Sequence, residues 1–436
     1  TLPSPCSIMY IARNTGRLYR VKEKLLLTET SSKFPRAKAF SFPSKQSIKL
    51  QTHLQRKHLS QSKFRWAKFA VKKILSGYKG KHMSALLDKI KKNSTIEDTA
   101  TLKASKIFGK KDVITTPVPM LNVALSGDPD GGLTPGLTVL AGPSKHFKTL
   151  FALVMAASFL KKYPDGVLIF YDNEFGSPTR YFESLNIDME RVIYSPITTI
   201  EQLKFDISNQ LAGLERNDKV CIVVDSVGNL ASNKEVEDAL NEKLVADMTR
   251  AKALKSLFRV VTPHLTLKDI PMVVINHTYK EQGMFPKDIV SGGTGIYYSA
   301  DNVWIIGRRQ DKDDKTKKID GYDFVINVDK SRFVKEKSQV PISVSWENGI
   351  NRWSGLLEES LEFKLIYKPQ NGKFSLVDTN TKWGDTKFSE DDINSNDELW
   401  EYMLSKSTLK EKLRDKYYNS SGGTLLSMDE IEEELE

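Results

Sequence analysis

Eight consecutive residues have the types and order of a loop that binds the phosphates of a nucleotide. They are Gly142, Pro143, Ser144, Lys145, His146, Phe147, Lys148 and Thr149. In such a loop the backbone N–H groups point at the phosphates, the lysine reaches the β and γ oxygens, and the threonine hydroxyl binds Mg²⁺. The pattern G-x-x-x-x-G-K-[ST] has glycine where this chain has Phe147. An ordinary Gly-Pro turn before a buried helix is therefore the alternative.

Two acidic positions supply further groups that hydrolysis of a nucleotide needs. Asp225 ends an apolar run, and a parallel sheet would place its carboxylate beside the loop, where it would hold the Mg²⁺ shell. Glu174 follows another apolar run, and we expect it to orient the attacking water as general base. The alternatives are a helix-capping Asp225 and a solvated Glu174 at the end of a strand.

A polar residue after a third apolar run, His277, is placed to sense the γ-phosphate and to pass that state to the next segment. The alternative is a structural histidine whose hydrogen bonds are all made within the fold. The following segment, Tyr279–Gly295, is rich in glycine, has no clear periodicity and carries Lys280, Met284, Phe285 and Lys287. A loop of this length usually has a function. Backbone donors that grip a DNA phosphate path, with apolar residues between bases, would supply one.

Apolar runs that alternate with helical patterns would bring these residues to one edge of a sheet. The runs are Leu137–Ala141, Val167–Asp172, Val220–Asp225, Met272–Asn276 and Val303–Gly307, and a helix is predicted over Leu150–Lys162. This alternation predicts an α/β fold with a mostly parallel sheet flanked by helices. Two later runs predict an antiparallel edge, and helices and a turn follow them. These elements are Phe324–Val328, Val340–Trp346, Leu356–Ile366, Leu399–Tyr418 and the turn at Asn371-Gly372.

The net charge of +10 is concentrated in one segment. Residues 1–82 contain 19 lysines and arginines against two glutamates, a net charge of +17, so the remaining residues carry −7. A nucleic-acid-binding arm or a transit-like peptide would have this composition. We interpret residues 1–82 instead as a basic, non-native extension of low structure, because Met83-Ser-Ala-Leu-Leu resembles a natural start.

Cysteine usage and hydropathy exclude several classes of protein. Cys6 and Cys221 make no disulfide framework, and no zinc-type spacing of Cys and His is present. Cys221 lies in a predicted buried strand, which indicates a reducing compartment. No apolar run reaches the roughly 18–20 residues of a membrane span, so no membrane association is expected.

The order and content of these motifs resemble the RecA recombinase family from Met83 to about Tyr418. The most specific stretches, besides Gly142–Thr149, are Phe170–Gly176, Asp225–Ser232, Asp238–Lys243, Asp247–Lys252, Ser256–Arg259, Ile275–Tyr279 and Gly292–Gly295. The branch of that family in T-even-like phages also has Phe in place of the second loop glycine. Phe147 is therefore a mark of that branch rather than damage to the loop.

The resemblance implies a role for each matching residue. Lys148 and Glu174 are catalytic, and His277 occupies the γ-phosphate sensor position, where bacterial relatives have Gln. Thr149 and Asp225 hold Mg²⁺, Tyr181 stacks on adenine, and Lys330 and Arg332 reach the ATP of the neighbouring protomer. The two DNA-binding loops match Glu235–Glu242 and Tyr279–Gly293. The DNA-binding candidates are Glu235, Asn241, Lys243, Tyr279, Lys280, Met284, Phe285, Lys287, Gly292, Gly293 and Thr294.

The resemblance also implies an organisation and a function. After the extension we expect an N-terminal arm that docks on the adjacent protomer (83–112), a RecA-type ATPase core (113–350), a small α+β C-terminal domain (351–419), and a linker with an acidic tail (420–436). The implied function is a DNA-dependent ATPase and strand-exchange recombinase. Its cofactors would be ATP and Mg²⁺, and it would form a helical homo-oligomeric filament on single-stranded DNA and pair it with homologous duplex.

The implied surroundings are the cytoplasm of an infected bacterial host, with a single-strand-binding protein and a recombination mediator as partners. The same ATPase core also occurs in ring motors such as replicative helicases, which is the main alternative. A passive DNA coat gated by ATP, without useful hydrolysis, is a second alternative. Glu174 argues against the passive coat.

Overall fold

The computed structural model describes residues 7–11, 18–22, 85–96, 98–105, 107, 111–176, 179–242, 249–281, 283, 286–312, 319–345 and 349–419. These divide into two compact units, 1–97 and 98–436. In the first unit, β1 (Ser7–Ile11) pairs antiparallel with β2 (Leu18–Lys22), and a helix spans 85–93. The predicted site residues all lie in the second unit.

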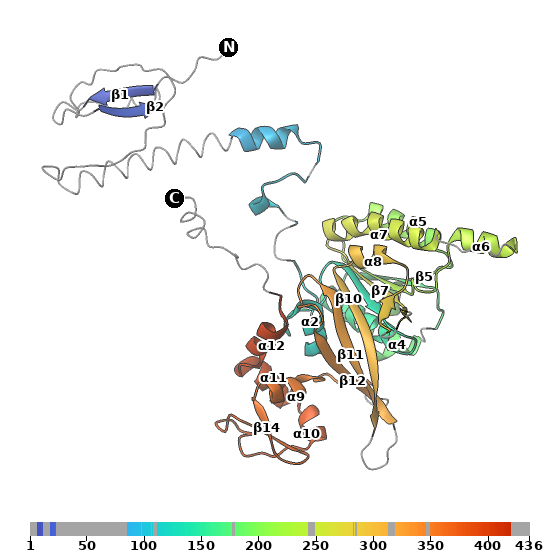
Figure 1. Cartoon of the computed structure of the whole chain (residues 1–436), viewed down its shortest axis with the longest axis vertical. Coiled ribbons are helices and arrows are strands. Elements are labelled where there is room, and N and C mark those ends of the chain that lie inside the picture. The colour runs from blue at the N-terminus through green and yellow to red at the C-terminus, as the bar shows by residue number, and fades with distance from the viewer. Residues whose placement is uncertain are drawn as a thin grey trace. The chain divides into compact units, whose positions relative to one another are not determined.

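A nine-stranded sheet organises the described part of the second unit (Figure 1). Its spatial order is β13 (Gly349–Ile350), β12 (Gln339–Ser345), β11 (Ile319–Ser331), β10 (Asn302–Lys312), β3 (Gly136–Ala141), β7 (Pro271–Asn276), β6 (Val220–Asp225), β4 (Val167–Asp172) and β5 (Val192–Pro196). The six strands from β10 to β5 are parallel, and β10 to β13 pair antiparallel. The α/β fold, the parallel sheet and the antiparallel edge are confirmed.

Both faces of the central parallel strands β3, β7, β6 and β4 are buried, which explains why these strands read as continuous apolar runs. On one face Leu140 of β3 belongs to the same cluster as Phe151 of α3 (Lys148–Lys162). On the other face Val139 joins Leu203 of α5 (Ile200–Gly213) and Leu257 of α7 (Thr249–Leu267). Alternate side chains of each strand therefore enter opposite cores, and the strand ends are held at fixed positions.

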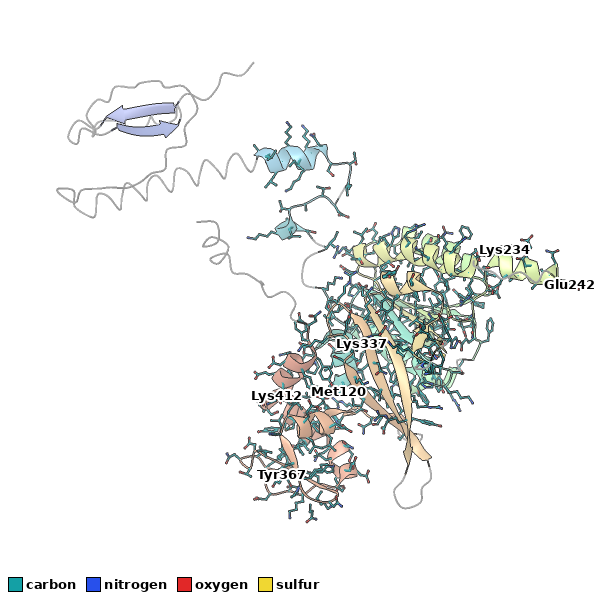
Figure 2. The ribbon with its side chains drawn as sticks, in the orientation of Figure 1. Met120, Lys234, Glu242, Lys337, Tyr367 and Lys412 are labelled. Atoms are coloured by element: carbon teal, nitrogen blue, oxygen red, sulfur yellow. The ribbon has the colours of Figure 1, made fainter. Side chains whose placement is uncertain are left out.

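The shorter elements of the second unit lie before and between these strands. They are the helices α2 (Pro119–Ser126), α4 (Thr179–Ser184), α6 (Asn233–Leu240) and α8 (Thr294–Ser299), the 3-10 turns Leu102–Ala104 and Met189–Arg191, and the hairpin of β8 (Thr278–Lys280) with β9 (Asp288–Val290). Lys234 lies near the start of α6, and Glu242 lies two residues beyond its end; both are labelled in Figure 2.

The last described elements pack against the core through a shared apolar cluster. They are α9 (Leu356–Glu362), the hairpin of β14 (Ile366–Gln370) and β15 (Lys373–Leu376), α10 (Glu390–Asn394), α11 (Asp397–Lys406) and α12 (Leu409–Tyr417). Arg414 and Lys410 of α12 form ion pairs with Asp128 (2.9 Å) and Asp130 (2.6 Å), which follow α2. The C-terminal elements are therefore held against the core by apolar packing and by ion pairs.

Three predicted elements differ from the structure. The helix predicted over Leu356–Ile366 ends at Glu362, because Ile366 already belongs to β14. The helix predicted over Leu399–Tyr418 is two helices. Ser407 ends the first because its hydroxyl accepts a bond from the Leu409 amide, and such side-chain bonds compete with the helix. The aperiodic segment from Tyr279 contains β8, β9 and the start of α8.

Candidate functional site

The eight-residue loop joins β3 to α3 at the carboxyl edge of the sheet. Gly142 passes close to β10, where an added Cβ would lie 2.9 Å from the Ile306 carbonyl oxygen. Lys148 begins α3, and its buried Nζ donates to the carbonyls of Gly142 (3.0 Å) and Pro143 (2.8 Å). Burial lowers the pKa of Lys148. The ammonium is thus held inside the loop, where a phosphate would be its strongest partner.

Phe147 adopts the left-handed conformation that the missing glycine would adopt easily. Its φ is +52°, and Lys145 in the same loop has a φ of +60°. The Phe147 ring packs on Phe324 of β11 with centroids 5.2 Å apart, and Phe324 in turn meets Phe151 edge-on. Aromatic packing therefore offsets the backbone cost of a non-glycine residue at this position.

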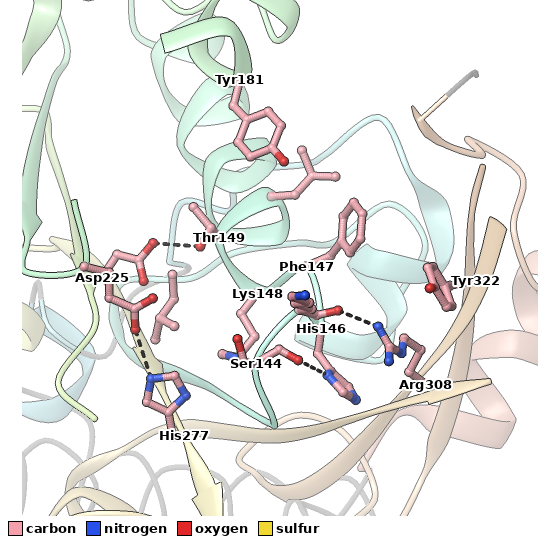
Figure 3. Close-up of a pocket in the computed structure, with 14 residues that line it drawn as sticks. Ser144, His146, Phe147, Lys148, Thr149, Tyr181, Asp225, His277, Arg308 and Tyr322 are labelled. Carbon is pink, nitrogen blue, oxygen red and sulfur yellow. Dashed lines mark hydrogen bonds and ion pairs between the residues drawn. The ribbon is translucent and has the colours of Figure 1, made fainter. Parts of the chain in front are cut away.

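Thr149 and Asp225 form a hydrogen-bonded pair beside the loop. The Thr149 hydroxyl donates to Asp225 Oδ2 at 2.7 Å (Figure 3). Burial raises the pKa of Asp225 to about 6, and the nearby carboxylates of Glu174 and Asp172 act in the same direction. A buried carboxylate partnered by a neutral hydroxyl fits a divalent cation. Mg²⁺ commonly takes one or two such protein oxygens and fills its remaining positions with phosphate and water.

Glu174 lies across the cavity from the loop, just after β4. Asp172 turns the chain there, because its Oδ1 accepts from the amides of Glu174 and Phe175, both at 3.0 Å. Glu174 Oε1 lies 2.9 Å from His277 Nε2 and accepts from the Ser226 hydroxyl at 2.6 Å. The hydrogen bond from His277 is the largest cause that lowers the pKa of Glu174. Glu174 is therefore ionised and able to accept a proton.

A cavity of about 370 Å³ joins these groups (Figure 3). Ten of the predicted residues line it, namely Ser144, Lys145, His146, Phe147, Lys148, Thr149, Glu174, Tyr181, Asp225 and His277. The cavity is large enough for a nucleotide-sized ligand.

Four lining residues were not among the predicted site residues, namely Leu150, Ile275, Arg308 and Tyr322. Arg308 donates to the Lys145 carbonyl at 3.2 Å, and its guanidinium lies 4.5 Å from the centre of the Tyr322 ring. Arg308 directly follows the apolar run Val303–Gly307. The rule that polar residues at strand ends face the ligand edge would have identified it.

Lys330 and Arg332 do not line the cavity of their own chain. Lys330 donates to the carbonyls of Tyr297 and Ala300, each at 2.8 Å, and burial lowers its pKa. Arg332 is exposed and forms an ion pair with Asp301 at 2.6 Å. Their role at a neighbouring protomer's nucleotide remains a prediction.

The predicted DNA-binding residues are divided between two segments that follow β6 and β7. In the first, Glu235 forms a capping box with Ser232, and Asn241 Nδ2 bonds the Glu237 carbonyl at 2.8 Å. In the second, Lys280 pairs with Asp288 at 2.9 Å.

The other candidates of the second segment differ in their settings. Tyr279 and Lys287 are exposed, and Gly292 and Gly293 have φ of +90° and +79° before Thr294 starts α8. Lys243, Met284 and Phe285 lie outside the described residues. DNA contact by either segment remains a prediction.

The second segment is tied directly to the site. Asn276, the last residue of β7, donates from Nδ2 to the Ser291 carbonyl at 2.8 Å, and the Ser291 amide donates to the His277 carbonyl at 2.9 Å. Both ends of the hairpin therefore meet at Asn276 and His277. Within the described residues, no helix is both long and apolar enough to cross a bilayer.

Comparison with known proteins yields one family and a consistent set of relatives. The model of the RecA N-terminal domain matches residues 81–351. The chain is 53% identical over 293 residues to the recombination and repair protein of Enterobacteria phage T4, covering 67% of this chain and 74% of that protein. It is 28% identical over 292 residues to Protein RecA of Arthrobacter sp. (strain FB24), covering 62% of this chain and 79% of that protein. It is 25% identical over 344 residues to Protein RecA of Xanthomonas axonopodis pv. citri (strain 306), covering 78% of this chain and 94% of that protein.

Proposed function

Because this chain belongs to the RecA family, we propose that it is an ATP-dependent DNA strand-exchange recombinase. It forms filaments on single-stranded DNA, pairs that strand with homologous duplex and hydrolyses ATP during turnover. The observation that supports this most is the meeting of three groups at one cavity. These are Lys148, the Thr149–Asp225 pair and Glu174. They are the cation, the metal ligands and the base that phosphoryl transfer requires.

Each group has a distinct part in hydrolysis. Lys148 exchanges its bonds to loop carbonyls for bonds to the β and γ oxygens of ATP, and the loop amides bind the same phosphates. Thr149 and Asp225 hold Mg²⁺, which neutralises charge on the phosphates when it is bound. Glu174 orients the attacking water and accepts its proton, while Tyr181 stacks on the base.

DNA and neighbouring protomers bind outside the cavity. The segments 235–243 and 279–294 bind the strand, and Lys330 and Arg332 extend to the nucleotide of the next protomer. The chain ahead of the core docks on that protomer. Because ATP is then bound between two protomers, it stabilises the filament. Since the second DNA segment is bonded to Asn276 and His277, nucleotide state sets its order.

A ring helicase, the main alternative, is not favoured. The relatives include a recombination and repair protein and RecA proteins, and the matched family model is that of RecA. We propose that the protein acts in the cytoplasm of an infected bacterial host, because one relative is a recombination and repair protein of phage T4. A single-strand-binding protein and a mediator would assist loading of the filament there.

A DNA-stimulated ATPase assay combined with D-loop formation tests the proposal. Lys148→Ala removes the phosphate cation and should lower hydrolysis by about 100-fold or more and abolish D-loops. Lys161→Ala is the matched control, because this exposed lysine lies at the far end of the same helix. D-loop formation by Lys148→Ala at the wild-type level would refute the assignment.

A further inference from the structure

One oxygen of Glu174 accepts hydrogen bonds from three side chains, two in the loop after β6 and one after β7. Ser226 Oγ donates to Oε1 at 2.6 Å, Asn229 Nδ2 donates at 3.1 Å, and His277 Nε2 lies 2.9 Å away. A carboxylate oxygen offers about two lone-pair directions, so three donors occupy this atom completely. In this arrangement Oε1 of Glu174 is directed at protein donors rather than at a water beside the γ-phosphate.

The three donors differ in how firmly they are held. Ser226 is fully buried, and its amide donates to Asn173 Oδ1 at 2.7 Å. Asn229 is the exposed one of the three. It lies between β6 and α6, so it stands at the entrance to the first predicted DNA segment.

Helix α7, which follows that segment, is hydrogen-bonded to the loop that contains Asn229. Arg250, near the start of α7, donates to the carbonyls of Val227 (3.0 Å), Gly228 (2.6 Å) and Leu230 (2.9 Å). These carbonyls flank Asn229 on both sides. Because α6 contacts α7, a shift of either helix is therefore transmitted through Arg250 to the backbone that carries the Asn229 amide.

The same backbone also packs on the third donor. A Cβ added at Gly228 would lie 2.3 Å from His277 Cδ2, so the two segments touch at this point without room for a side chain. Movement of residues 228–229 consequently changes the surroundings of both Asn229 and His277. Residues 228–229 lead into the first predicted DNA segment, and His277 leads into the second. The contact therefore joins the starts of both segments beside Glu174, the candidate general base.

We propose that Asn229 is a positioning residue that holds Glu174 in an idle orientation, and that a DNA strand bound along α6 draws Asn229 away and frees Glu174 for hydrolysis. The inference rests on the proposed function and deepens it, because it assigns DNA stimulation of the ATPase to one hydrogen bond. The residue acts through Glu174 and need not touch the nucleotide.

Three variants of the full chain test this with steady-state ATPase rates, measured without DNA and at saturating single-stranded DNA. Asn229→Ala should raise the DNA-free kcat about fivefold, the rate equivalent of about 1 kcal/mol for one hydrogen bond. The DNA-saturated kcat, the KM for ATP and the affinity for single-stranded DNA should stay at wild-type values. Asn229→Gln keeps the amide donor and should restore a low DNA-free rate. Asn380→Ala, an exposed asparagine of the C-terminal elements, is the matched control.

The possible outcomes separate this inference from the proposed function. A DNA-free kcat of Asn229→Ala at or below the wild-type value overturns the idle-state role. A fall in kcat under both conditions also overturns it, since Asn229 would then support the active orientation. A wild-type chain that hydrolyses no ATP with DNA present would instead overturn the proposed function, and this inference with it.

Discussion

The backbone at Phe147 offers a sharp test of how the loop tolerates the absence of its second glycine. Phe147 has a left-handed φ of +52°, and its partly buried ring packs on Phe324. Phe147→Gly and Phe147→Ala both remove the ring. Only glycine relieves the backbone, because alanine keeps a Cβ at a positive φ. The difference between the two variants therefore isolates the conformational cost.

The expected magnitudes follow from these contacts. A left-handed non-glycine residue costs about 1–2 kcal/mol, and glycine loses about 0.5–1 kcal/mol more chain freedom on folding than alanine. Phe147→Gly should therefore be more stable than Phe147→Ala by about 0.5–1 kcal/mol. Phe147→Ala should be less stable than wild type by about 2 kcal/mol, because a partly buried aromatic side chain is lost, and Phe147→Gly by about 1–1.5 kcal/mol.

Urea unfolding of the nucleotide-free chain measures this order through the transition midpoint at an unchanged m-value. Gln210 on the exposed face of α5 is the matched control site. There Gln210→Gly should be less stable than Gln210→Ala by about 1 kcal/mol, because the backbone is helical. If Phe147→Gly proves no more stable than Phe147→Ala, aromatic packing does not offset a left-handed strain at this position.

Two further predictions concern the carboxylates of the site. Glu174→Gln should retain ATP binding, measured with a fluorescent ATP analogue, and should lower the rate of hydrolysis about 100-fold. The exposed Glu183→Gln is the control and should keep wild-type rates. An unchanged rate in Glu174→Gln would instead support the passive DNA coat. Asp225→Asn should stabilise the nucleotide-free chain by about 2 kcal/mol above pH 7. The pKa of Asp225 is raised from 3.8 to about 6 by burial, so its stabilising contribution is complete below pH 4 and lost as pH rises through 6. The gain from asparagine should accordingly vanish near pH 4 in unfolding curves measured from pH 4 to 8, and a gain independent of pH would contradict the burial argument.

Much of the core could be predicted because its strands are apolar on both faces. The ranges predicted for β4 and β6 match the structure, and those for β3 and β7 begin one residue late. Strand β5 was missed, since its residues are mostly exposed or half-buried and carry no strong apolar run. The hairpin of β8 and β9 was missed as well, because strands of three residues are too short to show a period of two.

The chemistry of the site can be read from residue types and spacings alone, because the glycine, lysine and threonine of a phosphate loop, and the acids that follow later strands, occur in a recognisable order along the chain. The sequence also indicated that Asp225, Glu174 and His277 follow strands and so face one edge of the sheet. Tertiary structure alone decided which atoms meet. Strands distant in sequence became neighbours, which placed Asn229 and His277 on the same Glu174 oxygen and Arg308 against the loop. Hydrogen bonds require atoms within about 3 Å of each other, and no pattern of residue types along a chain fixes distances between segments that are joined only by folding.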